Sequence, residues 1–110
     1  MEITIKNKLS YSGTGEYVGR PTTLGNPFRV TEKQSRNIAI QRYSLLLKDA
    51  INHNDPAVLK FLRYLFDTLV SQNKLVLICW CVPKECHAEI VKKVLLNKYH
   101  TDNWLVNGEI

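Results

Sequence analysis

Thiol, imidazole and ammonium groups gather in one short segment, Cys81-Val82-Pro83-Lys84-Glu85-Cys86-His87. The segment follows an apolar run and precedes residues with helical periodicity, so we expect a turn between a buried strand and a helix. We expect Cys86 and His87 in the first turn of that helix, where backbone N–H groups and the helix dipole attract an anion. With the positive charge of Lys84, the segment could hold a phosphate or a carboxylate.

The helix dipole would also lower the pKa of the Cys86 thiol and so favour its thiolate form. Cys86 could then act as a nucleophile, with His87 as acid or base. Neighbouring residues on a helix point about 100° apart, so a direct pair of these two side chains is poorly oriented. The alternative is structural: Cys86 is a small packing residue, and the backbone satisfies the ring of His87.

Zinc is a further possibility for the same region, because Cys79, Cys81, Cys86 and His87 are four candidate ligands. The cysteines lack the usual spacing, in which two residues separate each pair of ligands. An odd, clustered count of three cysteines is not a secreted disulfide framework either. We therefore expect reduced thiols, no metal and no cofactor.

A second segment of interest runs from Gly19 to Phe28 and contains Gly-Arg-Pro and Gly-Asn-Pro-Phe. Gly25 could adopt a positive φ or allow a close approach by a ligand, and Arg20 could bind phosphate or carboxylate in a bidentate manner. Asn26 suits a base edge, a ribose or a loop-bracing role. The segment matches neither a dinucleotide fingerprint nor a Walker A loop. The alternative is a braced loop in which Arg20 pairs with an acid such as Glu16.

The periodicity of the chain predicts one α/β domain over residues 1–110, a small Rossmann-like three-layer sandwich with a mostly parallel sheet. Asp55 and Pro56 are a typical N-cap and first residue of a helix. The expected core includes Tyr43, Phe66 and Trp80. The expected strands cover 2–9, 16–18, 74–81 and, at an edge, 104–106, and the expected helices cover 32–52, a stretch from 56 onward and a stretch after 85.

In such sheets, ligands bind beside the loops that leave the carboxyl ends of the strands. The Gly19–Phe28 and Cys81–His87 segments are two such loops, so we expect them to meet at one rim and form the ligand site. The predicted ligand-binding residues are Gly19, Arg20, Gly25, Asn26, Lys84, Cys86 and His87.

Most of the formal net charge of +5 comes from the N-terminal half. Residues 1–50 hold eight Lys and Arg against four Asp and Glu, whereas residues 51–110 hold seven against six. This excess suggests an anionic partner, with a solvated basic surface as the alternative. No segment resembles a membrane span or a signal peptide, so we expect a cytoplasmic protein with no membrane partner.

The order of Gly19-Arg20-Pro21, Gly25-Asn26-Pro27-Phe28, Cys79-Trp80-Cys81 and Cys86-His87 resembles a bacterial and phage family. This is the domain-of-unknown-function family numbered four-three-two-six, and the resemblance covers about residues 16–95. It implies a compact Rossmann-like domain and, for a phage-encoded chain, location in the host cytoplasm. One enzyme branch of similar domains carries Pro-Gly-Gly-x-Gly-Thr before a catalytic Glu, which this chain lacks, so the phosphoribohydrolase reaction of that branch is not expected.

Three functions follow as hypotheses. The first is binding of a nucleotide-derived or phosphorylated small molecule; a specific version is a phage protein that sequesters a host defence signal. The second is hydrolysis of an N-glycosidic or phosphoester bond in the same pocket, with Glu16, Cys86 and His87 as candidate catalytic residues. The third is nucleic-acid binding, which is disfavoured because the basic residues are scattered. A homodimer that completes the pocket is a further expectation.

Overall fold

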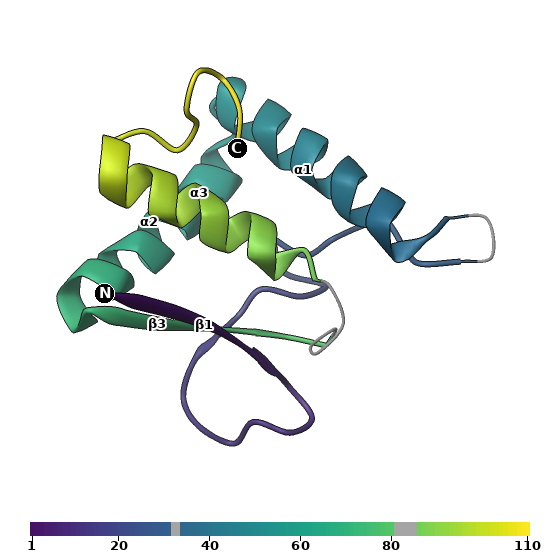
Figure 1. The fold of residues 1–110 in the computed structure, drawn as a ribbon, viewed down its shortest axis with the longest axis horizontal. Helices are drawn as coiled ribbons and strands as arrows, with labels where there is room; N and C mark the ends of the chain where they lie inside the picture. Colours follow the sequence, from purple (N-terminus) through teal and green to yellow (C-terminus); the bar gives the residue numbers. More distant parts are fainter. Residues whose placement is uncertain (32–33, 81–85) are drawn as a thin grey trace.

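The computed structural model describes residues 1–31, 34–80 and 86–110. In chain order, the elements in these residues are β1 (Glu2–Asn7), β2 (Glu16–Tyr17), α1 (Arg36–Asn52), α2 (Pro56–Gln72), β3 (Lys74–Cys79) and α3 (Ala88–Thr101). The α/β class predicted from the sequence is therefore confirmed, and Figure 1 shows the sheet below the helices.

The strands form a parallel sheet in the order β1-β3-β2, which places β3 in the centre. Every residue of β1 pairs with β3, from Glu2 opposite Lys74 to Asn7 opposite Cys79. β2 is much shorter and pairs only with Leu77 and Ile78 of β3. Because all strands run the same way, their carboxyl ends meet at one edge of the sheet.

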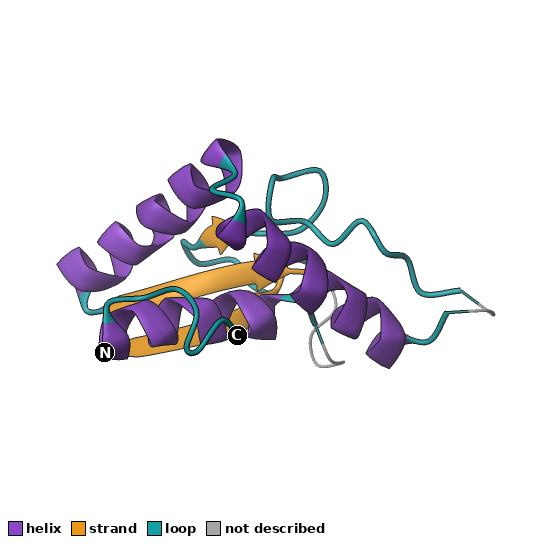
Figure 2. Cartoon of the chain, turned by 90° about the horizontal axis from the view of Figure 1, so that it is seen from above, coloured by secondary structure: helices purple, strands orange, loops and turns teal. Residues whose placement is uncertain are grey.

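The core lies between the sheet and the helices. Figures 1 and 2 show from two directions that helices lie over one face of the sheet. Leu75, Leu77 and Cys79 of β3 are buried in one cluster with apolar residues of α1, α2 and α3. Val76 and Ile78 point to the other face and are half-buried. There the loop between β1 and β2 covers them: a Cβ on Gly15 would lie within about 3 Å of both side chains. A loop thus covers the second face of β3.

Local sequence signals define the helices. At the start of α2, the Asp55 side chain accepts hydrogen bonds from two backbone N–H groups, and Pro56 occupies the first helical position. Asn73 ends α2 in the left-handed conformation, which asparagine tolerates well. At α1, the side chain of Ser35 accepts from the backbone N–H of Ile38. The predicted start of α2 is therefore confirmed to the residue.

Two predictions about large apolar residues are wrong. Trp80 was expected in the core, but strand β3 ends at Cys79 and the Trp80 side chain is 49% exposed. Residues 104–106 do not form an edge strand: Val106 makes only an isolated antiparallel bridge with Glu109. Trp104 instead packs edge-on against Phe66 of α2, with the ring centroids 5.9 Å apart. Tyr43, by contrast, is buried as expected.

None of the helices in the described residues is long and apolar enough to span a membrane. The longest two, α1 and α2, have 17 residues each, and both carry charged side chains on their outer faces.

Candidate functional site at the carboxyl ends of the strands

Three side chains, two of them exposed and one half-buried, lie where the parallel strands end. Lys8 follows β1, Tyr17 is the last residue of β2, and Trp80 follows β3. The backbone N–H of Lys8 donates to the carbonyl of Cys79 at 2.8 Å, which extends the sheet contact by one residue. We call Lys8, Tyr17 and Trp80 the rim cluster. Sheets of this kind bind ligands at this edge.

The rim cluster is held by a connected set of polar and cation–π contacts. The indole Nε1–H of Trp80 donates to the Tyr17 hydroxyl at 2.8 Å, and this hydroxyl donates to the Arg20 carbonyl at 2.5 Å. The Lys8 ammonium lies 4.4 Å from the centroid of the Tyr17 ring and 5.5 Å from that of Trp80. Such contacts fix the aromatic planes and place a positive charge beside them. The cluster therefore combines a flat apolar surface with a cation.

The sequence did not single out Lys8 and Tyr17 as site residues. A signal was present: both follow or end short strands whose carboxyl ends share an edge with β3. Trp80 was hidden by its position inside an apolar run, which suggested burial on both faces. The exposure of Trp80 depends on which residue of β3 is the last to pair with its neighbours, and hydrophobic periodicity cannot identify that residue.

The Gly19–Phe28 segment is a loop braced by its own backbone. Thr22 bonds to the Gly19 carbonyl through its N–H at 2.9 Å and its hydroxyl at 2.6 Å, and Gly25 N–H donates to Thr22. A Cβ on Gly25 would lie 2.8 Å from the backbone nitrogen of Arg20, so only glycine permits this close approach. The predicted special role of Gly25 thus has a structural cause, whereas its role in ligand binding stays a prediction.

Asn26 also braces this loop. Its side-chain carbonyl accepts from the backbone N–H of Phe28 at 2.9 Å, and its amide donates to the Ala39 carbonyl in α1 at 3.4 Å. Of the roles expected for Asn26, loop bracing is the one that these contacts make. The neighbouring Leu24 carbonyl accepts a hydrogen bond from the buried Tyr43 hydroxyl at 2.7 Å, which ties the loop to α1 a second time.

Behind the rim, His87 connects the loop to the start of α3. Its ring is buried, and Nε2 lies 2.7 Å from the carbonyl oxygen of Val18. A carbonyl can only accept, so Nε2 carries the hydrogen and Nδ1 is the acceptor of the neutral ring. Burial lowers the pKa of His87, and the positive charge of nearby Arg20 lowers it further. His87 is therefore neutral at pH 7, with Arg20 close by.

Cys86 and His87 lie just before α3 rather than in its first turn. α3 begins at Ala88, and His87 is its N-cap residue but makes no side-chain cap. Cys86 is buried, with its sulfur 2.8 Å from that of Cys79 and 3.5 Å from Nδ1 of His87. Within the described part of the chain, no group of three or more His, Cys, Asp or Glu could hold a metal. Lys84 and Cys81 lie outside the described residues.

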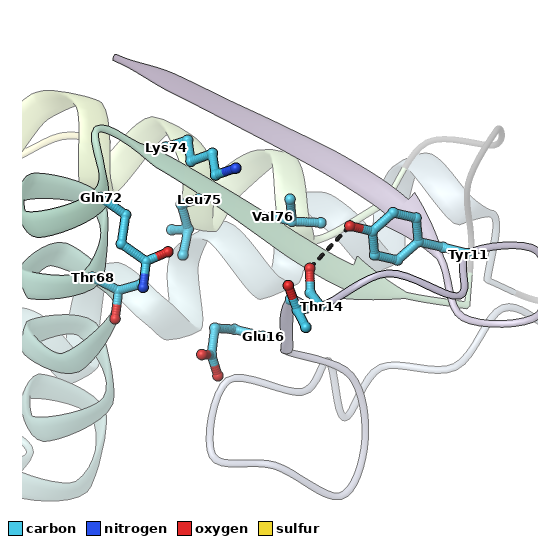
Figure 3. A pocket seen from close by; sticks show the side chains of 9 residues that line it. Tyr11, Thr14, Glu16, Thr68, Gln72, Lys74, Leu75 and Val76 are labelled. Carbon is cyan, nitrogen blue, oxygen red and sulfur yellow. Dashed lines mark hydrogen bonds between the residues drawn. The ribbon is translucent and has the colours of Figure 1, made fainter.

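The structure does not bring Glu16 to the rim. Its carboxylate accepts a hydrogen bond from the Tyr64 hydroxyl of α2 at 2.7 Å. Glu16 lines an open depression of about 200 Å³ near the start of β3. Figure 3 shows its side chain opposite Thr68 and Gln72 of α2. Among the described residues an ion pair joins Lys48 and Glu109, and the pairing of Arg20 with Glu16 that was one alternative for the loop is not made.

The predicted residues thus separate into two places. Gly19, Arg20, Gly25 and Asn26 share one loop, and His87, next to Cys86, contacts Val18 immediately before this loop. Glu16 faces α2 instead.

The comparisons with known proteins agree with the resemblance seen in the motifs. No curated protein and no solved structure shows a significant match to the chain. The family described as Domain of unknown function (DUF4326) matches residues 3–97, which include the Gly19–Phe28 loop, the rim cluster and most of α3. Because the match spans most of the 110 residues, the chain belongs to the DUF4326 family.

Proposed function

We propose that this domain binds a nucleotide-derived or otherwise phosphorylated small molecule at the carboxyl ends of its strands. The observation that carries the proposal is the rim cluster: an exposed tryptophan beside a lysine, with Arg20 on the adjacent loop. A flat aromatic surface stacks with a nucleobase, and adjacent cations attract phosphate. Parallel sheets present ligand sites at this edge.

Each residue has a defined part in this proposal. The outer face of Trp80 stacks on the base, and Lys8, already beside the two rings, contacts a phosphate oxygen. Arg20 binds a second phosphate oxygen; its backbone is fixed by the Tyr17 hydroxyl and by the turn that Gly25 permits. Asn26 and His87 hold the loop in place from behind.

The geometry supports binding better than hydrolysis. Cys86 and His87, the candidate nucleophile and base, are 2% and 5% exposed, so a substrate bond at the rim would not reach them directly. Glu16, the other candidate base, faces α2 and hydrogen-bonds to Tyr64. General acid–base catalysis needs the group within hydrogen-bond reach of the reacting atom.

Tryptophan fluorescence tests the proposal, because the chain has only two tryptophans. In a Trp104→Phe chain, Trp80 is the single reporter and lies at the proposed site. We expect titration with a panel of mono-, di- and cyclic nucleotides to give saturable quenching with at least one member. The absence of saturable quenching and of calorimetric heat with every member, at high protein concentration, would contradict nucleotide binding.

Paired lysine variants locate the site. Lys8→Gln removes the cation beside the rings and should weaken binding by about 10- to 150-fold, since a charge-assisted contact contributes roughly 1.5–3 kcal/mol. Lys74→Gln is the matched control: this lysine is exposed and is the first residue of β3, at the opposite end of the strand from Trp80. Equal weakening by both variants would mean that only the overall charge of the protein matters.

A further inference from the structure

Two cysteine sulfurs from different elements meet directly beneath the rim. Cys79 is the last residue of β3, and Cys86 lies two residues before α3. Both side chains are buried in the main core cluster, and both are in the thiol form. Their Sγ atoms are 2.8 Å apart. Because Cys79 precedes Trp80, any bond between these sulfurs would lie next to the rim cluster.

The separation of the sulfurs is close to that of a covalent bond. A disulfide has a sulfur–sulfur distance of about 2.05 Å, so the two atoms need to move by less than about 1 Å. The pair would close a ring of chain from the end of β3 to the start of α3. A neighbouring base is already present, since Nδ1 of His87 is the ring's acceptor and faces Cys86 at 3.5 Å.

We propose that Cys79 and Cys86 form a reversible disulfide that locks the end of β3 to the start of α3, with a peroxide as oxidant. His87 Nδ1 accepts the proton of the Cys86 thiol, and the thiolate sulfur attacks one peroxide oxygen. The O–O bond breaks, leaving a sulfenic acid on Cys86 and a hydroxide that takes the proton from His87 to form water.

The second thiol completes the reaction. The Cys79 sulfur attacks the Cys86 sulfur, the S–O bond breaks, and the departing hydroxide takes the Cys79 proton to form a second water. Two electrons pass from the two thiols to the peroxide, and a dithiol reductant restores both thiols by exchange. The small size of a peroxide suits sulfurs that are 0% and 2% exposed at the residue level. This modification is independent of whether the rim binds a nucleotide.

The test is mass spectrometry of the intact chain after equimolar hydrogen peroxide, with alkylation of remaining thiols. The third cysteine, Cys81, is close in sequence, so a Cys81→Ser chain is used beside the unaltered one, and both are checked for the same urea midpoint. We expect each to lose two hydrogen atoms. Trypsin cleaves after Lys84, so peptides 75–84 and 85–92 should be joined. Dithiothreitol should separate them.

A matched control and a second measurement test whether the bond joins Cys79 to Cys86. Cys86→Ala should show no loss of two hydrogen atoms and no joined peptides. If Cys81→Ser does not fold, tandem fragmentation of the joined peptides from the unaltered chain places the bond on one side or the other of Trp80. A bond to Cys81 rather than Cys79, oxidation of Cys86 to sulfinic acid without a bond, or a co-purified zinc ion that blocks the reaction would each overturn the proposal.

Discussion

His87 shows how burial of a single ring makes stability depend on pH. Its pKa is lowered below the ordinary value of 6.5 mainly by burial and further by the charge of Arg20, while the bond to Val18 opposes the shift. The unfolded chain therefore binds a proton at a higher pH than the folded chain does. Stability contributed by the neutral ring is present above pH 6.5 and is lost as the pH falls from 6.5 through the folded-state pKa.

We expect the urea midpoint of the protein to fall between pH 7 and pH 5 for this reason. The drop should be smaller in His87→Gln, and unchanged in His53→Gln, because His53 is exposed. Carboxylates titrate at lower pH, so the window near pH 6 reports the histidines. If His87→Gln does not fold, an NMR titration of the His87 ring replaces it, and a ring that titrates above pH 6.5 would disprove the expected direction.

Gly25 has a steric role that a single methyl group can test. In Gly25→Ala the new Cβ would lie 2.8–2.9 Å from backbone atoms of Gly19 and Arg20, and backbone cannot move aside as a side chain can. We expect the free energy of unfolding to fall by about 1–3 kcal/mol, measured by urea denaturation. Gly13→Ala is the control, since the three atoms nearest to its Cβ all belong to the Tyr11 side chain, which can move aside. Equal losses in both variants would contradict the argument.

At the scale of elements, the start of α2 depends on one carboxylate. Asp55 accepts from the N–H groups of Ala57 at 3.0 Å and Val58 at 3.2 Å. Asp55→Ala should lower the free energy of unfolding by about 1 kcal/mol. Asp67→Ala, an exposed position within the same helix, should change it by less than about 0.5 kcal/mol. A cap that makes no contribution would give the same urea midpoint in both.

The elements that carry strong local signals were predictable from the sequence. The cap Asp55, the helix-period apolar residues of α1 and α2, and the alternation around Ile3 and Ile5 act within a few neighbouring residues. The apolar run at 75–79 likewise identified the central strand. Such signals depend on backbone geometry and nearest neighbours, so a single sequence contains them.

The remaining features depend on contacts between distant residues. Trp80 is exposed because pairing stops at Cys79, and Glu16 leaves the rim because its pairing with Leu77 turns it toward Tyr64. Trp104 follows a helix and packs on Phe66 instead of joining the sheet. Residue type and spacing identified the two loops, but the sheet register decided which side chains meet.

At the scale of the whole molecule, the C-terminal segment closes the helical layer. Residues 98–110 lie beyond the family match, yet Trp104 packs against Phe66 and lies within 6 Å of two cations, Arg63 and Lys98. Glu109 reaches back to Lys48 of α1 at 2.8 Å. The Cα radius of gyration is 13.4 Å, close to the value of about 13 Å expected for a compact chain of this length.

The homodimer stays a prediction, for which native mass spectrometry gives the subunit count.

The short length of β2 has a consequence for amide protons. At the two ends of β1, the N–H of Glu2 donates to the carbonyl of Asn73 and the N–H of Lys8 donates to the carbonyl of Cys79. The backbone N–H and C=O groups of odd-numbered residues along β3 therefore point toward β1. The backbone groups of even-numbered residues point toward β2, where the N–H of Val18 donates to the carbonyl of Ile78. The pairing of β2 with β3 begins at Leu77, so it does not extend to Val76. In deuterium oxide, the amides of Leu75 and Leu77 should therefore exchange slowly, and that of Val76, between them, much faster. Equal protection of all three amides would show that the edge of the sheet beside the depression is closed in solution.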